Sequence, residues 1–145
     1  MIWIMAALET SPRTFPVRLL PGDDLRRALE AVVVAQGMAA AFVVAGIGSL
    51  RPAEIRLAGA QEVMTIDSDT ELLTLSGSVA STGSHLHMSV ADQQGRVVGG
   101  HACYGCTVRT TAEVLLVLLP EWHFSRKLDR ATGWAELAIK RNTGA

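Results

Sequence analysis

The sequence predicts an α+β domain, built on a mainly antiparallel sheet of about seven strands with one principal helix at residues 23–36. Three observations predict it: one clear helical period, a series of alternating or continuous apolar stretches after that period, and Gly or Pro residues between the stretches. A length of 145 residues fits one domain and leaves no room for two well-built ones.

The composition excludes several classes of protein. The chain has 13 Lys+Arg against 14 Asp+Glu, a formal net charge of −1, and 49% hydrophobic residues. A chain this apolar is not disordered, and it lacks the positive charge that usually drives nucleic-acid binding. The charged fraction of 19% lies below the roughly 25% usual for globular chains, which favours burial of part of the surface in an oligomer. An Ala/Val-rich monomer is the alternative.

The chain is expected to divide into an extended lead-in at 1–14, a single domain at 15–140 and a tail at 141–145. Pro12 and Pro16 indicate the extended lead-in. The alternation that follows predicts a first strand at 15–20.

The helix is predicted from its start signal, its spacing and its stop. Asp23 is a suitable N-cap, and Asp24 favours the positive end of the helix dipole. Gly37 ends the pattern. The apolar residues at helical spacing are Leu25, Leu29, Val32 and Val33.

The remaining chain is interpreted mostly as strands. The continuous apolar run at 39–45 predicts a strand buried on both faces. Further strands are expected at 53–58, 62–66, 71–80, 84–91, 96–98, 102–109 and 114–119. The tail is mixed, with Trp122, Phe124 and Trp134 as expected packing residues.

The histidines stand out as a candidate site. His85 and His87 form an H-x-H pair, and residues two apart in a strand point to the same face. If the turn at 93–95 closes a hairpin, residue 87 pairs near residue 101, so His101 should face His87 across two antiparallel strands. The adjacent pair Gly99-Gly100 is interpreted as a bulge that re-aims His101.

Three imidazoles at one corner suit Zn²⁺, or another divalent transition metal, with an open fourth position. The alternative is that the histidines are solvated or satisfied by neighbours. Glu71, Glu113 and Cys103 are candidates to hydrogen-bond the imidazoles, to activate water or to bind a ligand. Their alternative roles are surface ion pairs for the carboxylates and a small buried residue for Cys103. No catalytic nucleophile or general base is assigned.

Other motifs give weak signals. Cys103 and Cys106 form C-x-x-C between strand-like flanks, which is unlike a redox motif, and one pair is no disulfide framework, so a reducing cytoplasm is expected. No apolar run reaches the roughly 18 residues of a membrane span. The cluster of Arg126, Lys127 and Arg130 is interpreted as a solvated face.

Ordered segments over about residues 15–140 resemble the PPC domain, the plants-and-prokaryotes-conserved domain, in its prokaryotic single-domain form. These segments are Arg18 with Pro21-Gly22-Asp23-Asp24-Leu25, Gly46-Ile47-Gly48-Ser49-Leu50, Glu71-Leu72-Leu73-Thr74-Leu75-Ser76-Gly77-Ser78, Ser84-His85-Leu86-His87-Met88-Ser89-Val90, Gly99-Gly100-His101, Thr110-Thr111-Ala112-Glu113-Val114, and Arg126, Asp129, Thr132-Gly133 and Leu137.

The resemblance implies an α+β sheet domain that assembles as a homotrimer, and it implies metal ligation by His85, His87 and His101. Plant members follow AT-hooks, and bacterial members commonly carry a DNA-binding label by that association. This chain has no Arg-Gly-Arg-Pro, and the plant segment Gly-Arg-Phe-Glu-Ile-Leu appears here at 68–73 as Ser-Asp-Thr-Glu-Leu-Leu.

Three hypotheses about function follow. The first is a trimeric, nominally DNA-linked binding or regulatory module, with weak intrinsic DNA binding because a trimer would carry a charge of about −3. The second is a metal-dependent enzyme or small-ligand-binding protein that uses the three histidines and takes a small anion at the metal; an enzyme is the less favoured form because no catalytic residue is assigned. The third is an assembly protein without a ligand.

Overall fold

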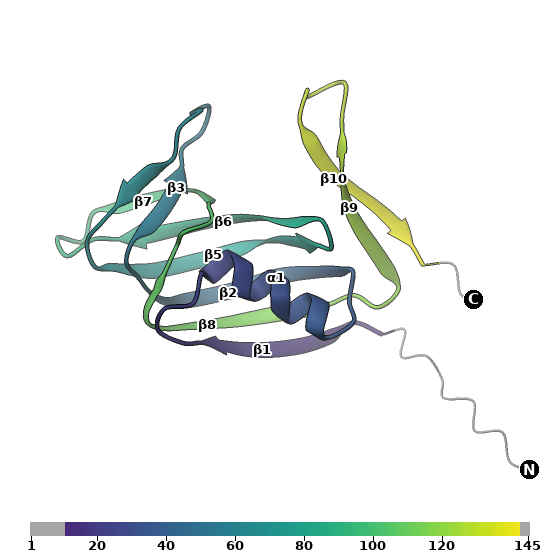
Figure 1. Cartoon of the computed structure of the whole chain (residues 1–145), viewed down its shortest axis with the longest axis horizontal. Helices are drawn as coiled ribbons and strands as arrows, with labels where there is room; N and C mark the ends of the chain where they lie inside the picture. Colours follow the sequence, from purple (N-terminus) through teal and green to yellow (C-terminus); the bar gives the residue numbers. More distant parts are fainter. Residues whose placement is uncertain (1–10, 143–145) are drawn as a thin grey trace, which may run out of the picture.

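The structure is a computed structural model that describes residues 11–142. Its centre is an eight-stranded sheet with the order β1-β8-β2-β5-β6-β7-β3-β4, in which every neighbouring pair is antiparallel (Figure 1). The prediction of a mainly antiparallel α+β domain with one principal helix is confirmed, and the sheet has one strand more than expected. The strands are β1 (Arg13–Leu19), β2 (Ala40–Leu50), β3 (Ala53–Arg56), β4 (Met64–Ile66), β5 (Thr70–Ala80), β6 (Gly83–Ala91), β7 (Val97–Ala102), β8 (Val108–Leu118), β9 (Trp122–Leu128) and β10 (Ala135–Arg141).

The helix, α1 (Leu25–Ala35), lies across one face of the sheet (Figure 1). Its N-cap is Asp24, whose side chain accepts a hydrogen bond from the Arg27 amide, so the prediction of Asp23 as the cap is wrong. The Asp23 carboxylate instead accepts from the Leu20 amide at 2.8 Å, which closes the preceding turn. The apolar stripe of α1 packs into the main core through Leu25, Leu29 and Val33.

The sheet therefore has an inner face, which α1 covers, and an opposite side that we call the outer face. Strand β6 alternates as predicted: Leu86, Met88 and Val90 are buried in the core. His85 and His87 are exposed on the outer face. A strand with a polar outward side needs cover on one face only.

Strand β2 departs from its prediction. The run at 39–45 is predicted to be buried on both faces, but Phe42 and Val44 are 39% and 53% exposed, and Ile47, which follows the run, is 57% exposed. The expectation is wrong for the single chain because the one helix among residues 11–142 covers only the inner face. The outer face therefore presents large apolar side chains to solvent.

Two local predictions near His101 are wrong. Residues 103–107 form a turn rather than a strand, and Gly105 takes a φ of +98° there, so the strand expected at 102–109 belongs in two elements. The pairing of β6 with β7 runs without a register shift, so Gly99 and Gly100 make no bulge. Gly100 instead allows β3 to approach, because a Cβ at that position would lie 2.6 Å from the Arg56 carbonyl oxygen.

The tail forms a hairpin that the sequence did not predict. Strands β9 and β10 pair with each other and stand away from the large sheet (Figure 1), and we call them the arm. Phe124 is buried as expected, against Ala40 and Ala80, with Trp122 packed beside them. Trp134 is 61% exposed, so its expected packing role is not observed.

The two ends of the sheet framework meet at one corner. Arg13, the first residue of β1, pairs with Leu118 of β8. Arg141, the last residue of β10, pairs with Trp122. Trp122 follows Leu118 by only a few residues in the sequence, so the two pairs lie near each other. Among residues 11–142, no helix has the length and apolar character needed to cross a bilayer.

Candidate metal centre

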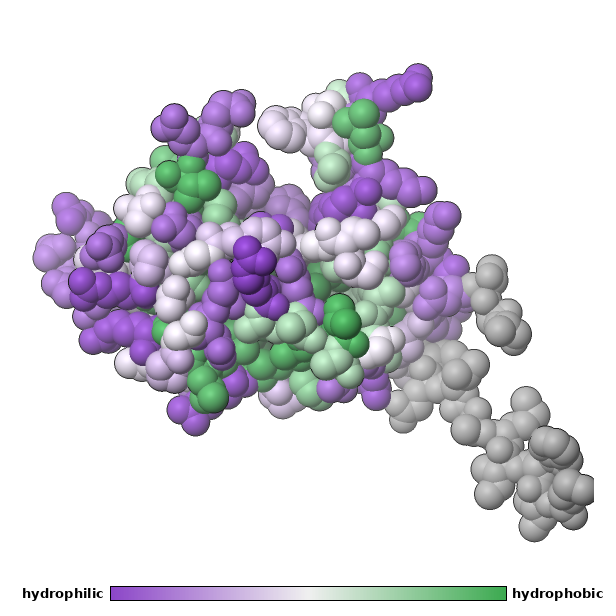
Figure 2. Space-filling model, in the orientation of Figure 1, coloured by the Kyte–Doolittle hydropathy of each residue, from purple (hydrophilic) through white to green (hydrophobic). Residues whose placement is uncertain are grey.

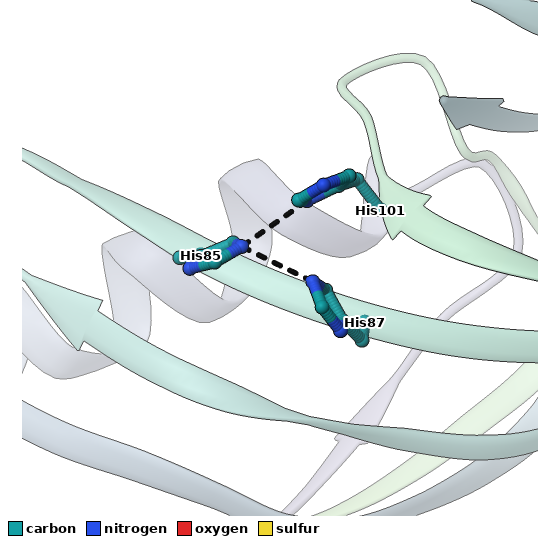
Figure 3. Close-up of side chains that lie close together, drawn as sticks. All are labelled: His85, His87 and His101. Carbon is teal, nitrogen blue, oxygen red and sulfur yellow. Dashed lines mark hydrogen bonds between the residues drawn. The ribbon is translucent and has the colours of Figure 1, made fainter. Parts of the chain in front are cut away.

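The hairpin of β6 and β7 brings three imidazoles together. His87 and His101 are direct cross-strand partners, as the turn arithmetic predicted. His85 lies two residues along β6 on the same face, and its Nε2 is 3.1 Å from both His101 Nδ1 and His87 Nε2 (Figure 3). One ligand atom from each residue lies within 4.8 Å of the others.

This spacing suits a small transition metal ion. A tetrahedral ion with bonds of about 2.0–2.1 Å to imidazole nitrogen places its ligand nitrogens about 3.3 Å apart. The two separations of 3.1 Å that involve His85 need only small adjustments to match, and the ligand atoms of all three residues lie within 4.8 Å of one another. Three nitrogen ligands on two strands leave the remaining coordination position free to face solvent or a ligand.

The surroundings favour the neutral imidazole, which is the form that binds a metal. Burial lowers the pKa of His85, and the neighbouring His87 and the Arg126 guanidinium lower it further. Burial also lowers the pKa of His101, and the next largest cause is the charge of Arg56. The protein therefore holds both groups ready for coordination near neutral pH.

A cavity of about 570 Å³ opens beside the cluster. His85 and His101 both line it, between the arm and the tip of the β3–β4 hairpin; Figure 2 shows a notch between these two projections. The other lining side chains that matter are three arginines, two aromatic residues and one carboxylate: Arg26, Arg56, Arg126, Tyr104, Trp134 and Glu136. The sequence reasoning assigned no role at a site to any of these six.

One wall of the cavity is a dense hydrogen-bond network around Glu30. The Glu30 carboxylate accepts from the Ser84 amide and from the Tyr104 hydroxyl, each at 2.9 Å. Arg26 pairs with the same carboxylate and stacks over the Tyr104 ring, with 4.1 Å between its guanidinium carbon and the ring centre. It also donates to the carbonyl oxygen of Ser84. This network fixes the wall and neutralises the charge of Arg26.

The other predicted site residues lie in different places. Cys103 lines the cavity, and its Sγ lies 3.7 Å from the His101 carbonyl oxygen. Glu71 pairs with Ala91 at the far end of β6, and Glu113 lies on β8. Both carboxylates line a separate hollow of about 400 Å³, so the structure does not bring them to the imidazoles.

The sequence profile of the Plants and Prokaryotes Conserved (PCC) domain matches residues 7–120. The chain belongs to this family. Solved structures extend the PCC likeness: a hypothetical protein from Salmonella cholerae-suis shares 36% identity and a TM-score of 0.88, covering 92% of this chain and 97% of its own. A structure from Archaeoglobus fulgidus, described as a metal-containing protein, shares 27% identity and a TM-score of 0.76, with 92% and 99% coverage.

A protein from Pyrococcus horikoshii, described as plant- and prokaryote-conserved, shares 28% identity and a TM-score of 0.73, with 85% and 89% coverage. Structures from Bacteroides thetaiotaomicron and Ralstonia eutropha carry provisional DNA-binding names, and at 18% and 22% identity they show the fold alone.

Curated relatives place a similar PCC domain in a longer chain. The "Bifunctional protein GlmU" of Synechococcus sp. (strain JA-3-3Ab) is 47% identical over 131 residues, which is 90% of this chain. The chain spans about a fifth of the length of that relative, 21%.

Proposed function

We propose that this PCC domain is a metal-dependent binding module, which holds Zn²⁺ or another divalent transition metal on His85, His87 and His101 and takes a small anion at the remaining position. The observation that supports it is the close set of three imidazoles, two of which, His85 and His101, line a cavity that arginines also line. The Archaeoglobus relative described as metal-containing supports it as well.

The residues of the chain would have different roles in such a site. The three imidazoles supply neutral nitrogen ligands, and the bound metal supplies a Lewis acid at its open position. The arginines of the cavity attract an anion toward that position. The Glu30 network holds the wall beside His85 in place.

Metal analysis tests the proposal. We expect about one zinc per chain in protein purified without an affinity tag, and loss of it in His87→Ala. The matched control is His123→Ala, because His123 is exposed on β9 outside the cluster. A wild-type protein that binds no divalent transition metal on titration would remove the proposal.

Hydrolysis at the metal is the second candidate, and Glu136 favours it. This carboxylate lines the cavity and accepts from the Thr132 hydroxyl at 3.0 Å, and it would be the general base of a hydrolytic site whose metal His85, His87 and His101 would hold. If hydrolysis is the function, Glu136→Gln abolishes turnover of an ester substrate while the metal stays bound. Equal turnover in the variant and the wild type would argue against it.

We also propose that the domain assembles through its outer face. The number of subunits that we expect is three, because the family resemblance implies a homotrimer. Exposed Phe42, Ile47 and Leu115 on that face support association. Direct DNA binding is expected to be weak because the net charge is −1. Tight, salt-sensitive mobility shifts by the isolated protein would contradict this expectation.

A further inference from the structure

The arginines of the cavity differ in whether a carboxylate or only neutral groups bind their guanidinium. Arg26 is bound to Glu30 and to backbone oxygens, so the Glu30 carboxylate already balances its charge. Arg56 makes one long hydrogen bond, from Nη1 to the Ala60 carbonyl oxygen at 3.4 Å. Arg126 donates from Nη2 to the Ser78 hydroxyl at 2.7 Å, which is a neutral partner. Arg56 and Arg126 therefore keep charge available for a ligand.

These two arginines flank the histidine cluster from different elements. Arg56 on β3 is the direct cross-strand partner of His101, so the two side chains start from the same face of the sheet about 5 Å apart. Arg126 comes from the arm and reaches Ser78, which is the cross-strand partner of His85. One guanidinium thus stands on the β3 side of the cluster and the other on the β5 side.

The charges of this arrangement are unbalanced. A divalent metal on the imidazoles, together with Arg56 and Arg126, would face a single lining carboxylate, that of Glu136. Cations that line one partly buried cavity repel one another unless an anion joins them. A ligand with one negative charge would balance only part of this excess.

The size and lining of the cavity indicate more than an inorganic ion. Its volume of about 570 Å³ falls in the range of small-molecule sites, which is about 300–1,000 Å³. Tyr104 and Trp134 add aromatic surface, and Ala60, Ala102 and Ala135 add apolar surface around the cations. Such a lining fits an organic body between acidic groups.

We propose that the cavity binds a small organic anion with at least two acidic groups, one at the metal and one held by Arg56 or Arg126. The inference rests on the proposed metal function and adds the class of ligand to it. Carboxylate and phosphate groups share this chemistry, because a guanidinium donates two parallel hydrogen bonds to either.

Calorimetric titration of the zinc-loaded full chain tests the inference with three probes: butyrate, succinate and 3-phosphoglycerate. We expect at least one of the two diacids to bind tenfold or more tightly than butyrate, and the better of them indicates which acidic group the site prefers. Arg56→Gln or Arg126→Gln should weaken that diacid about tenfold and leave butyrate unchanged. The matched control is Arg96→Gln, because Arg96 is exposed in the β6–β7 turn and pairs with Asp92.

Several outcomes would overturn the inference. Equal affinity for the monoacid and both diacids would do so, as would diacid binding that neither arginine variant changes or no binding of any probe to the zinc-loaded protein. Zinc content, measured in every sample, separates the two proposals. If wild type and His87→Ala bind the diacid equally and hold no zinc, the metal function fails and the placement of one acidic group at the metal fails with it; a loss of binding in the arginine variants would then support only the contact with the arginines.

Discussion

Two cysteines with a C-x-x-C spacing occupy different environments. Cys106 is fully buried, and its Sγ accepts from the Glu54 amide at 3.2 Å and lies 3.3 Å from the Glu54 carbonyl oxygen. Burial raises the pKa of the Cys106 thiol to about 11. Cys103 lines the cavity instead, and both cysteines are free. A buried thiol that stays protonated is structural rather than redox-active.

The raised pKa of Cys106 predicts a loss of stability at alkaline pH. The folded state holds this proton more tightly than the unfolded chain, so the stabilisation is complete below pH 9 and is lost as pH rises through about 11. The advantage of wild type over Cys106→Ala in free energy of unfolding should fall by about 2–3 kcal/mol over that window. Urea unfolding at pH 8 to 11 measures it. Cys103→Ala should follow the wild-type curve, and a constant gap between wild type and Cys106→Ala would contradict the expectation.

Gly77 is a single residue on which the histidine geometry depends. It pairs with Leu86, between the two histidines of β6, and its φ is +144°. A Cβ there would lie 2.8 Å from the Leu86 Cα and would also strike the His85 carbonyl oxygen.

Gly77→Ala should therefore destabilise the fold by at least about 2 kcal/mol and weaken zinc binding. Urea unfolding and metal titration measure the two effects. The control is Gly95→Ala, because Gly95 also has a positive φ, +77°, but lies in open space, so its variant should keep full zinc affinity. Equal losses in the two variants would show that backbone strain alone matters.

At the level of elements, local pattern explains what could be predicted. The β6–β7 register follows from alternation and a turn, both visible within about twenty residues of sequence, and the pairing of His87 with His101 was correct. The strand-like pattern of the sequence continues through residues 103–107, so it did not predict the turn at Gly105. The pairing of β3 with β7 joins segments far apart in sequence, so no local signal could place Arg56 beside His101.

The arm was missed because its two strands lack clean alternation. Strand β10 has no buried residue in the single chain, and β9 has one, Phe124. Without the hairpin, Arg126 looked like part of a solvated basic cluster instead of a cavity wall. The candidate ligands could thus be predicted from sequence, and the cationic surroundings could not.

The arm depends on Phe124 for its attachment. This side chain packs with Ala40 and Ala80 and meets the Phe42 ring edge-to-face at 5.6 Å. Phe124→Ala should weaken arm docking by about 3 kcal/mol. Amide exchange should then speed up in β9 and β10 and stay slow in β6, with zinc retained. Faster exchange throughout the sheet would mean that the arm is part of the main cooperative unit.

At the scale of the whole molecule, the low charged fraction corresponds to the uncovered outer face. The structure has one helix against an eight-stranded sheet, so one layer is bare on one side. Ile47 and Leu115 are exposed on this outer face, and they line a shallow hollow of about 650 Å³.

A charge on this face should break the assembly. We expect the wild type to sediment at about 46 kDa, three times the 15.5 kDa of one chain, and Ile47→Asp to sediment as a monomer. Burying an unpaired carboxylate in an apolar interface is too costly for association. Val34→Asp is the control, because Val34 is exposed on α1, on the covered side of the sheet. A monomeric wild type would contradict assembly through the outer face.

The corner where Arg13 pairs with Leu118 and Arg141 pairs with Trp122 has a consequence for gene architecture. A domain whose chain enters and leaves at one corner can be inserted into another protein without separating the segments of that protein on either side of the insertion. The Synechococcus relatives, of which the matching region makes up 21%, are the kind of composite that such geometry permits.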